Sequence, residues 1–140
     1  PPPRFFLYTT TLNAALLWSV GGSEFCIGHR YKTRPHIGAV IHTHQMYASI
    51  VAAAQNDVEI INVEHQKILG ANVIKAAPYA LPNTKKITVE TAKAIEHSNA
   101  ALMANHGTVC IGKNLDETFN VARTLEIACQ LFIESRKKSA

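Results

Sequence analysis

The segment Ala39-Val-Ile-His-Thr-His-Gln45 decides how the rest of this sequence is interpreted. Its apolar first half is typical of a buried strand, which would end at two histidines separated by one residue. Because side chains alternate between the two faces of a strand, we expect His42 and His44 to project from the same face. Two imidazoles on one face, at the end of a buried strand, are typical of two ligands of a divalent metal ion. The alternative is a pair of surface histidines at a strand end, and the spacing alone does not separate these interpretations.

The composition indicates one globular domain. The chain has 140 residues, of which 47% are hydrophobic and 17% charged, so it can build a core and is not expected to be disordered. The formal net charge is only +4. We interpret the short basic cluster at 136–138 as a solvated helix end, so no nucleic-acid partner is predicted. A basic pocket for an anionic small molecule would fit this charge equally well.

Three cysteines without a CxxC pair predict reduced intracellular thiols rather than a disulfide framework. No apolar run approaches the roughly 20 residues that span a bilayer, so no membrane partner is expected. The first residues lack the layout of a signal peptide, and a cytoplasmic location is therefore predicted. Residues 1–21 mix strand and helix signals and open with three prolines. We expect a single domain over 1–140 whose N-terminal part is incomplete.

Strands and helices alternate along the rest of the chain. Ser23 is a candidate N-cap for a helix from Glu24 to Lys32 that would end before Arg34-Pro35. Glu24 would then place a favourable negative charge in the first turn. Further helices are predicted over 46–54, 88–98 and 116–137, and strands over 58–63, 73–76, 100–103 and 108–111. This alternation predicts an α/β or α+β sandwich.

A third histidine stands in a position like that of the first two. His106 follows the predicted strand 100–103, and the next residue, Gly107, permits a close approach of the backbone. Alone, such a histidine is more often structural than a ligand, but with His42 and His44 it completes a set of three. Three protein ligands with an open fourth position are typical of a catalytic zinc, which acts as a Lewis acid. The reaction also needs a proton carrier, and Glu24 is the best placed carboxylate in the sequence.

Five motifs, in matching order, resemble the class II aldolase/adducin family, and within it the branch of the L-fuculose-phosphate aldolases. The motifs are Ser23-Glu24, Arg34-Pro35, Ala39-Val-Ile-His-Thr-His44, Ala77-Pro-Tyr-Ala80 and Asn99-Ala-Ala-Leu-Met-Ala-Asn-His-Gly107. The resemblance covers about Gly22 to the C-terminus. Two long motifs with matching separation are much more specific than either motif alone.

The resemblance implies a three-layer α/β/α sandwich around a mainly antiparallel central sheet. It implies that His42, His44 and His106 bind one zinc ion per subunit, that Glu24 is the catalytic acid/base, and that Ser23 contacts the substrate phosphate. The implied enzyme is a lyase of carbohydrate metabolism. It would reversibly cleave a ketose 1-phosphate, similar to L-fuculose 1-phosphate, into dihydroxyacetone phosphate and an aldehyde, with the zinc holding the enediolate. A homotetramer with active sites at the subunit contacts is also implied.

The chain also departs from the family pattern. A phosphate-binding loop of the Gly-Asn-Ser type is not recognisable, and Gly21-Gly22-Ser23 stands where Pro-Ser-Ser is usual. The stretch between Glu24 and Arg34 is one residue shorter than in the family. His65 stands near the position of a proton-donating tyrosine, either as its replacement or as an ordinary loop histidine.

Three alternatives within the family stay open. They are an L-ribulose-5-phosphate 4-epimerase, a sugar-phosphate dehydratase and a non-catalytic adducin-like module. The epimerases resemble this chain but carry aspartate instead of the glutamate and a longer gap before the third histidine. Glu24 and the spacing from His44 to His106 therefore favour the aldolase, while the three histidines argue against the non-catalytic module. The motifs do not identify the sugar.

Overall fold

The computed structural model describes residues 5–9, 17–20, 23–26, 37–81 and 84–138. At its centre lies a five-stranded sheet with the strand order β1-β4-β9-β8-β7. These strands are β1 (Phe5–Thr9), β4 (Ala39–Thr43), β9 (Gly107–Gly112), β8 (Ala100–Met103) and β7 (Ala76–Ala77). All neighbours run antiparallel except β7 and β8, which are parallel. The sheet is therefore mixed but mainly antiparallel, as predicted.

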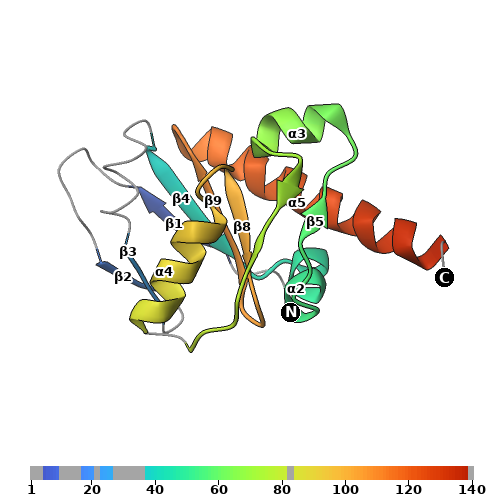
Figure 1. Ribbon diagram of the computed structural model, residues 1–140. Coiled ribbons are helices and arrows are strands. Elements are labelled where there is room, and N and C mark those ends of the chain that lie inside the picture. Colours follow the sequence, from blue (N-terminus) through green and yellow to red (C-terminus); the bar gives the residue numbers. More distant parts are fainter. Residues whose placement is uncertain (1–4, 10–16, 21–22, 27–36, 82–83, 139–140) are drawn as a thin grey trace.

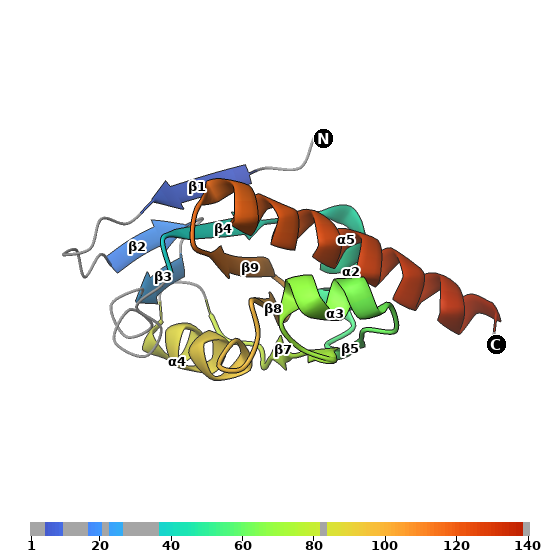
Figure 2. The same ribbon diagram turned by 90° about the horizontal axis from the view of Figure 1, so that it is seen from above.

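Helices cover both faces of this sheet (Figure 1, Figure 2). On one face lie α2 (Met46–Ala53), α3 (Val63–Leu69) and α5 (Leu115–Lys138), and on the other lies α4 (Lys85–Ala94). Two smaller sheets flank these layers, formed by β2 (Leu17–Val20) with β3 (Ser23–Cys26) and by β5 (Val58–Glu59) with β6 (Val73–Ile74). The arrangement confirms the predicted three-layer α/β/α sandwich.

The alternation of side chains along the strands divides the buried apolar residues into two cores. The core between the sheet and α2, α3 and α5 includes Ile41, Leu69, Leu102, Cys110, Val121 and Leu125. The core between the sheet and α4 includes Val40, Ile87, Ile95, Ala101, Val109 and Ile111. Each fully buried isoleucine or leucine contributes about 1.5–3 kcal/mol relative to an exposed one. Val40 belongs to the α4 core, so His42, two residues further along β4, projects from the α4 face of the sheet.

The helix predicted from Glu24 to Lys32 is wrong at its start, because Ser23–Cys26 forms strand β3. This strand pairs with β2 in antiparallel register, with Ser19 opposite Glu24. The capping signal at Ser23 is local, and pairing with a partner strand overrides it, as tertiary context often overrides propensity. The remainder of the predicted helix lies outside the described residues.

The other predicted elements are present, with shifted ends. Helix α4 begins earlier than expected, because Thr84 rather than Thr88 is its N-cap, with its hydroxyl oxygen accepting from the Ile87 amide at 3.4 Å. The strand predicted over 58–63 is limited to β5, because Asn62 caps α3 instead. Within the described residues, no helix combines the length and the apolar character that a membrane crossing requires. Cys110 and Cys129 are free and buried, and burial raises the pKa of each thiol to about 12.

Candidate metal centre

The structure brings His42, His44 and His106 together at one end of the central sheet. One ring nitrogen from each histidine lies within 4.8 Å of those from the other two. The ring centroids are 4.8 Å apart for His42 and His44, 4.9 Å for His42 and His106, and 5.4 Å for His44 and His106. The rings are steeply inclined to one another, at 71° to 86°. Three nitrogen donors therefore converge on one point.

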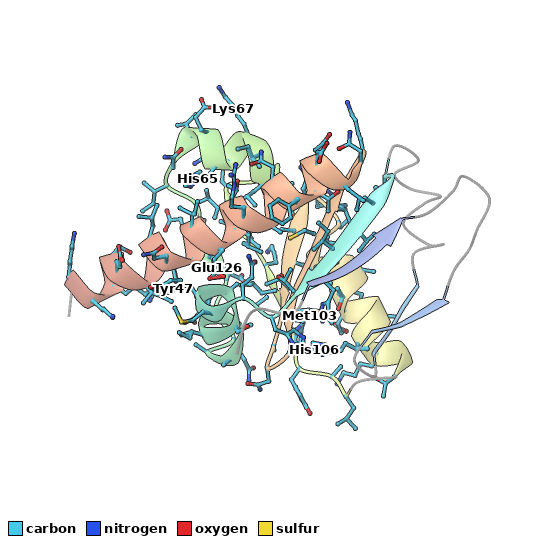
Figure 3. The ribbon with its side chains drawn as sticks, turned by 180° about the vertical axis from the view of Figure 1, so that it is seen from behind. Tyr47, His65, Lys67, Met103, His106 and Glu126 are labelled. Atoms are coloured by element: carbon cyan, nitrogen blue, oxygen red, sulfur yellow. The ribbon has the colours of Figure 1, made fainter. Side chains whose placement is uncertain are left out.

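The pairing of β4 with β9 explains why a histidine so distant in sequence joins the other two. His42 lies in β4 and His44 follows directly after the strand, with the side chain of Thr43 between them on the opposite face. Thr43 is paired with Thr108 of β9. This register brings the turn between β8 and β9, which carries His106, next to the end of β4 (Figure 3).

The conformation of this turn places the His106 ring. Asn105 has φ 55°, in the left-handed region that asparagine tolerates better than most residues. The His106 amide then donates to the Met103 carbonyl oxygen at 2.9 Å, which closes the turn. At Gly107 a Cβ atom would collide with the Thr43 carbonyl oxygen and with the ring of His44. A glycine is needed here because the backbone of β9 approaches His44 so closely.

The surroundings of His42 determine its tautomer. Its Nδ1 lies 2.8 Å from the carbonyl oxygen of Thr108, and a carbonyl only accepts, so the hydrogen is on Nδ1. The lone pair is then on Nε2, which lies 2.9 Å from Nε2 of His44. This is the arrangement in which a metal-binding histidine is held by a hydrogen bond from its other nitrogen.

Burial lowers the pKa of two of the three histidines, His42 and His106. It lowers the pKa of His42 to about 3, with further lowering by His106 and His44, and the bond to Thr108 opposes this only in part. The pKa of His106 is lowered as well, first by burial and then by the neighbouring His44. Neutral imidazoles have the lone pairs that bind metal, whereas protonated ones do not.

The nitrogens are close enough together for the three histidines to hold one metal ion. Zinc–nitrogen bonds of about 2.0–2.1 Å in tetrahedral geometry place neighbouring ligand nitrogens roughly 3.4 Å apart. The Nε2 atoms of His42 and His44 are 2.9 Å apart, which is shorter than this spacing. The upper limit for all pairs in the set, 4.8 Å, is longer than it. The three histidines could therefore hold a metal ion, with one coordination position left for another ligand.

The side chains of the predicted acid/base residue, Glu24, and of the predicted phosphate contact, Ser23, lie outside the described part of the structure. Glu24 and Ser23 are in β3, which lies next to α4, on the side of the sheet that carries the histidines. Their roles stay predictions. His65 lies on α3 and lines a cavity of about 420 Å³ together with residues of α5. Figure 3 places it well away from His106, so His65 does not belong to the cluster within this chain.

The sequence interpretation missed Glu126 of α5. Its Oε1 accepts hydrogen bonds from the backbone amides of Tyr47, at 2.6 Å, and Ala48, at 3.2 Å, in the first turn of α2. Burial raises the pKa of this carboxyl group, and the two backbone bonds offset part of the rise. The available signal was an acidic residue next to the buried stripe of α5, four residues after Ala122 and three before Cys129.

Comparison with known proteins gives a consistent result. Residues 28–133 match the family described as Class II Aldolase and Adducin N-terminal domain. L-fuculose phosphate aldolase of Escherichia coli strain K12 is 30% identical over 105 residues, which are 74% of this chain and 47% of that protein. The 5-deoxy-D-ribulose 1-phosphate aldolase of Bacillus thuringiensis serovar kurstaki is 27% identical over 106 residues, covering 76% of this chain and 49% of that protein.

Solved structures give the same picture. A structure of L-fuculose 1-phosphate aldolase superposes with a TM-score of 0.73 at 29% identity, over 80% of this chain and 52% of that one. An L-fuculose-1-phosphate aldolase from Thermus thermophilus, at 21% identity and TM-score 0.65, shares the fold over 79% of this chain and 60% of that one. The chain thus spans about half the length of the curated relatives that it matches.

Proposed function

This chain belongs to the class II aldolase and adducin family, and on that premise we propose that it is a zinc-dependent aldolase. The proposed reaction is the reversible cleavage of a ketose 1-phosphate into dihydroxyacetone phosphate and an aldehyde. The observation that carries the proposal is the convergence of three histidine rings, whose donor nitrogens lie within 4.8 Å of one another. A non-catalytic module of the same fold would have no use for such a cluster.

The proposed zinc ligands are His42, His44 and His106. A zinc ion bound there would supply a Lewis acid that favours negative charge on substrate oxygens. The protein prepares the ligands for it, because the Thr108 carbonyl orients the His42 ring and burial keeps that ring unprotonated. The bare backbone at Gly107 leaves room for the ring of His44.

Proton transfer is assigned to Glu24 and phosphate recognition to Ser23. Cleavage between two carbons removes the proton of the hydroxyl group that becomes the aldehyde and adds a proton to the carbon that leaves as part of dihydroxyacetone phosphate. A positioned carboxyl group can carry out the second transfer. The location of β3 beside α4, on the histidine side of the sheet, supports this assignment. A hydroxyl next to this carboxyl group would help to hold the substrate phosphate.

The substrate class is inferred from the names of the relatives. Those compared above are aldolases of L-fuculose phosphate and of 5-deoxy-D-ribulose 1-phosphate, two ketose phosphates that differ in their sugar parts. We propose an L-fuculose 1-phosphate-like substrate and would assay both compounds. The homotetramer and the cytoplasmic location stay predictions. Large exposed apolar side chains, such as Met46 at 64% and Ile61 at 74% exposure, are compatible with subunit contacts.

The test is to measure bound metal and turnover in the purified chain. We expect about one zinc per chain and release of dihydroxyacetone phosphate from L-fuculose 1-phosphate, measured with a coupled NADH-dependent dehydrogenase. The double variant His42→Ala with His44→Ala is expected to lose both. His97→Ala is the matched control, because His97 is exposed and its recorded ion pair is with the side chain of Glu96 at 3.9 Å. Unchanged metal content and turnover in the double variant would refute the proposal.

A further inference from the structure

We propose that Glu126 is a positioning residue for the three-histidine cluster, which it holds in place through the first turn of α2. The inference rests on the proposed function, because it assigns the cluster a metal. Glu126 belongs to α5, and its recorded hydrogen bonds go to α2 rather than to the histidines. Figure 3 shows it beside Tyr47, at the junction of α2 and α5.

Helix α2 needs an acceptor from outside its own sequence. It begins at Met46, two residues after His44, and the side chain of its N-cap residue, Gln45, makes no capping hydrogen bond. The first turn of α2 holds no acidic residue. Glu126 Oε1 fills this role by accepting from the amides of Tyr47 and Ala48, where a negative charge also complements the helix dipole.

The N-termini of helices α3 and α4 are capped by side chains from neighbouring residues in the sequence. Helix α3 is capped by Asn62 and α4 by Thr84, each the residue directly before its own helix. In α2 the capping group comes from a distant helix and is half-buried. Its second oxygen, Oε2, is buried without a hydrogen-bond partner among the described residues. Burying a carboxylate costs free energy. The hydrogen bonds of Glu126 both cap the N-terminus of α2 and connect this first turn to α5.

A second anchor lies on the other side of His44. The hydroxyl of Thr43 is 2.6 Å from that of Thr108 and donates to Gln45 Oε1 at 3.1 Å. The same Thr108 accepts from His42 through its carbonyl oxygen. His42 is bonded to β9 through this carbonyl oxygen and lies four residues before α2. His44 lies only two residues before α2, between the anchor at Thr43 and the anchor at Glu126. Loss of Glu126 should consequently displace His44 more than His42.

The experiment compares substitutions at Glu126 with a control on the same helix. Glu126→Ala removes the acceptor, and Glu126→Gln keeps a carbonyl oxygen that can accept from both amides. Glu134 is the matched control, since it is exposed and its recorded hydrogen bond is accepted from Gln130 within α5. Zinc affinity of the full chain is measured by competition with a chromophoric chelator, and the histidine ring signals of the metal-free chain are recorded by NMR.

We expect Glu126→Ala to weaken zinc binding about tenfold, which is typical of losing a residue that orients a metal ligand. Glu126→Gln should recover most of the affinity, and Glu134→Ala should stay within about twofold of the unsubstituted chain. In the metal-free protein, Glu126→Ala should shift and broaden the ring signals of His44 more than those of His42, whose Nε2 lies 2.9 Å from Nε2 of His44. Amide hydrogen exchange at Tyr47 and Ala48 should become faster.

The inference is overturned if Glu126→Ala lowers the melting temperature but leaves zinc affinity and the His44 signals unchanged, because Glu126 would then only stabilise the fold. If Glu126→Ala does not fold, Glu126→Asp provides the test. The shorter side chain keeps the charge but withdraws the oxygen from Tyr47, and zinc affinity equal to that of the unsubstituted chain would again overturn the inference. A chain that binds no zinc refutes the proposed function, while the His44 signals still decide whether Glu126 positions that ring.

Discussion

The two faces of β4 differ in chemistry although their residues alternate along five positions. On the α4 face, His42 is buried and neutral, and its ring meets those of His44 and His106. On the α5 face, Thr43 is also buried, but its recorded hydrogen bonds go to Thr108 and Gln45. The α4 face of β4 carries the nitrogen donors, and the hydrogen bonds on the α5 face hold the strand in position.

This difference shows how the fold separates binding from support. A metal ligand must keep a lone pair available, so its other hydrogen bonds are limited to those that orient the ring. A supporting residue can satisfy all its polar groups within the protein, as the hydroxyl of Thr43 does. Substitutions on the two faces should therefore change different measured quantities.

The largest effect, on zinc affinity, is expected when a histidine on the α4 face of β4 is replaced. His42→Ala removes one proposed ligand, and zinc affinity should fall by more than about 100-fold, beyond the loss expected for an orienting residue. Metal content after dialysis, measured by mass spectrometry, checks this, with His97→Ala as the control. A chain that keeps stoichiometric zinc without His42 would show that this face holds no metal centre.

The next largest effect is expected in the stability of the metal-free chain, which should depend on pH because of His42 on the α4 face of β4. The folded-state pKa of His42, about 3, lies below its unfolded value of 6.5. As pH falls below 6.5, the unfolded state therefore binds the proton first, so the stability of the metal-free chain should decline towards pH 3. The decline from this residue is at most roughly 5 kcal/mol. Urea denaturation at several pH values measures it, and His42→Ala should have a flatter profile than the unsubstituted chain.

A smaller effect is expected from a substitution at Gly107 of β9, whose backbone lies against Thr43 and His44. In Gly107→Ala the added methyl group meets the Thr43 carbonyl oxygen and the His44 ring, so β4 and β9 must separate locally. We expect a loss of stability of about 1–3 kcal/mol, typical of overpacking, together with weaker zinc binding. Thermal unfolding with and without zinc separates these contributions. If the variant unfolds like the unsubstituted chain and binds zinc equally well, the close approach at Gly107 has no role.

The smallest effect on metal binding is expected from the α5 face. Thr43→Val keeps the shape of the side chain but removes its hydroxyl, which leaves Thr108 Oγ1 and Gln45 Oε1 without this partner. The free energy of unfolding should decrease by about 1–3 kcal/mol, while zinc affinity should change less than about tenfold. Chelator competition and urea denaturation of the same preparation give both values. A larger loss of zinc affinity than in His42→Ala would remove the distinction between the faces.

Much of the fold was predictable because its signals are local. The apolar run at the start of Ala39–Thr43 and the apolar stripe of Leu115–Lys138 identified β4 and α5, and α5 begins and ends within one residue of its predicted bounds. Such patterns depend only on neighbours along the chain. The start of the helix predicted from Glu24 was wrong for the same reason, since a local capping signal says nothing about a partner strand such as β2.

The sequence by itself determined that His42 and His44 share one face, because strand geometry requires it. It also determined the order of motifs that relates this chain to its family. Only the tertiary structure decided that His106 meets them, since that depends on the register between β4 and β9. The same holds for Glu126, whose carboxylate reaches Tyr47 only because α5 packs against the start of α2. Contacts between distant segments arise when whole surfaces are buried together, and short patterns do not encode that burial.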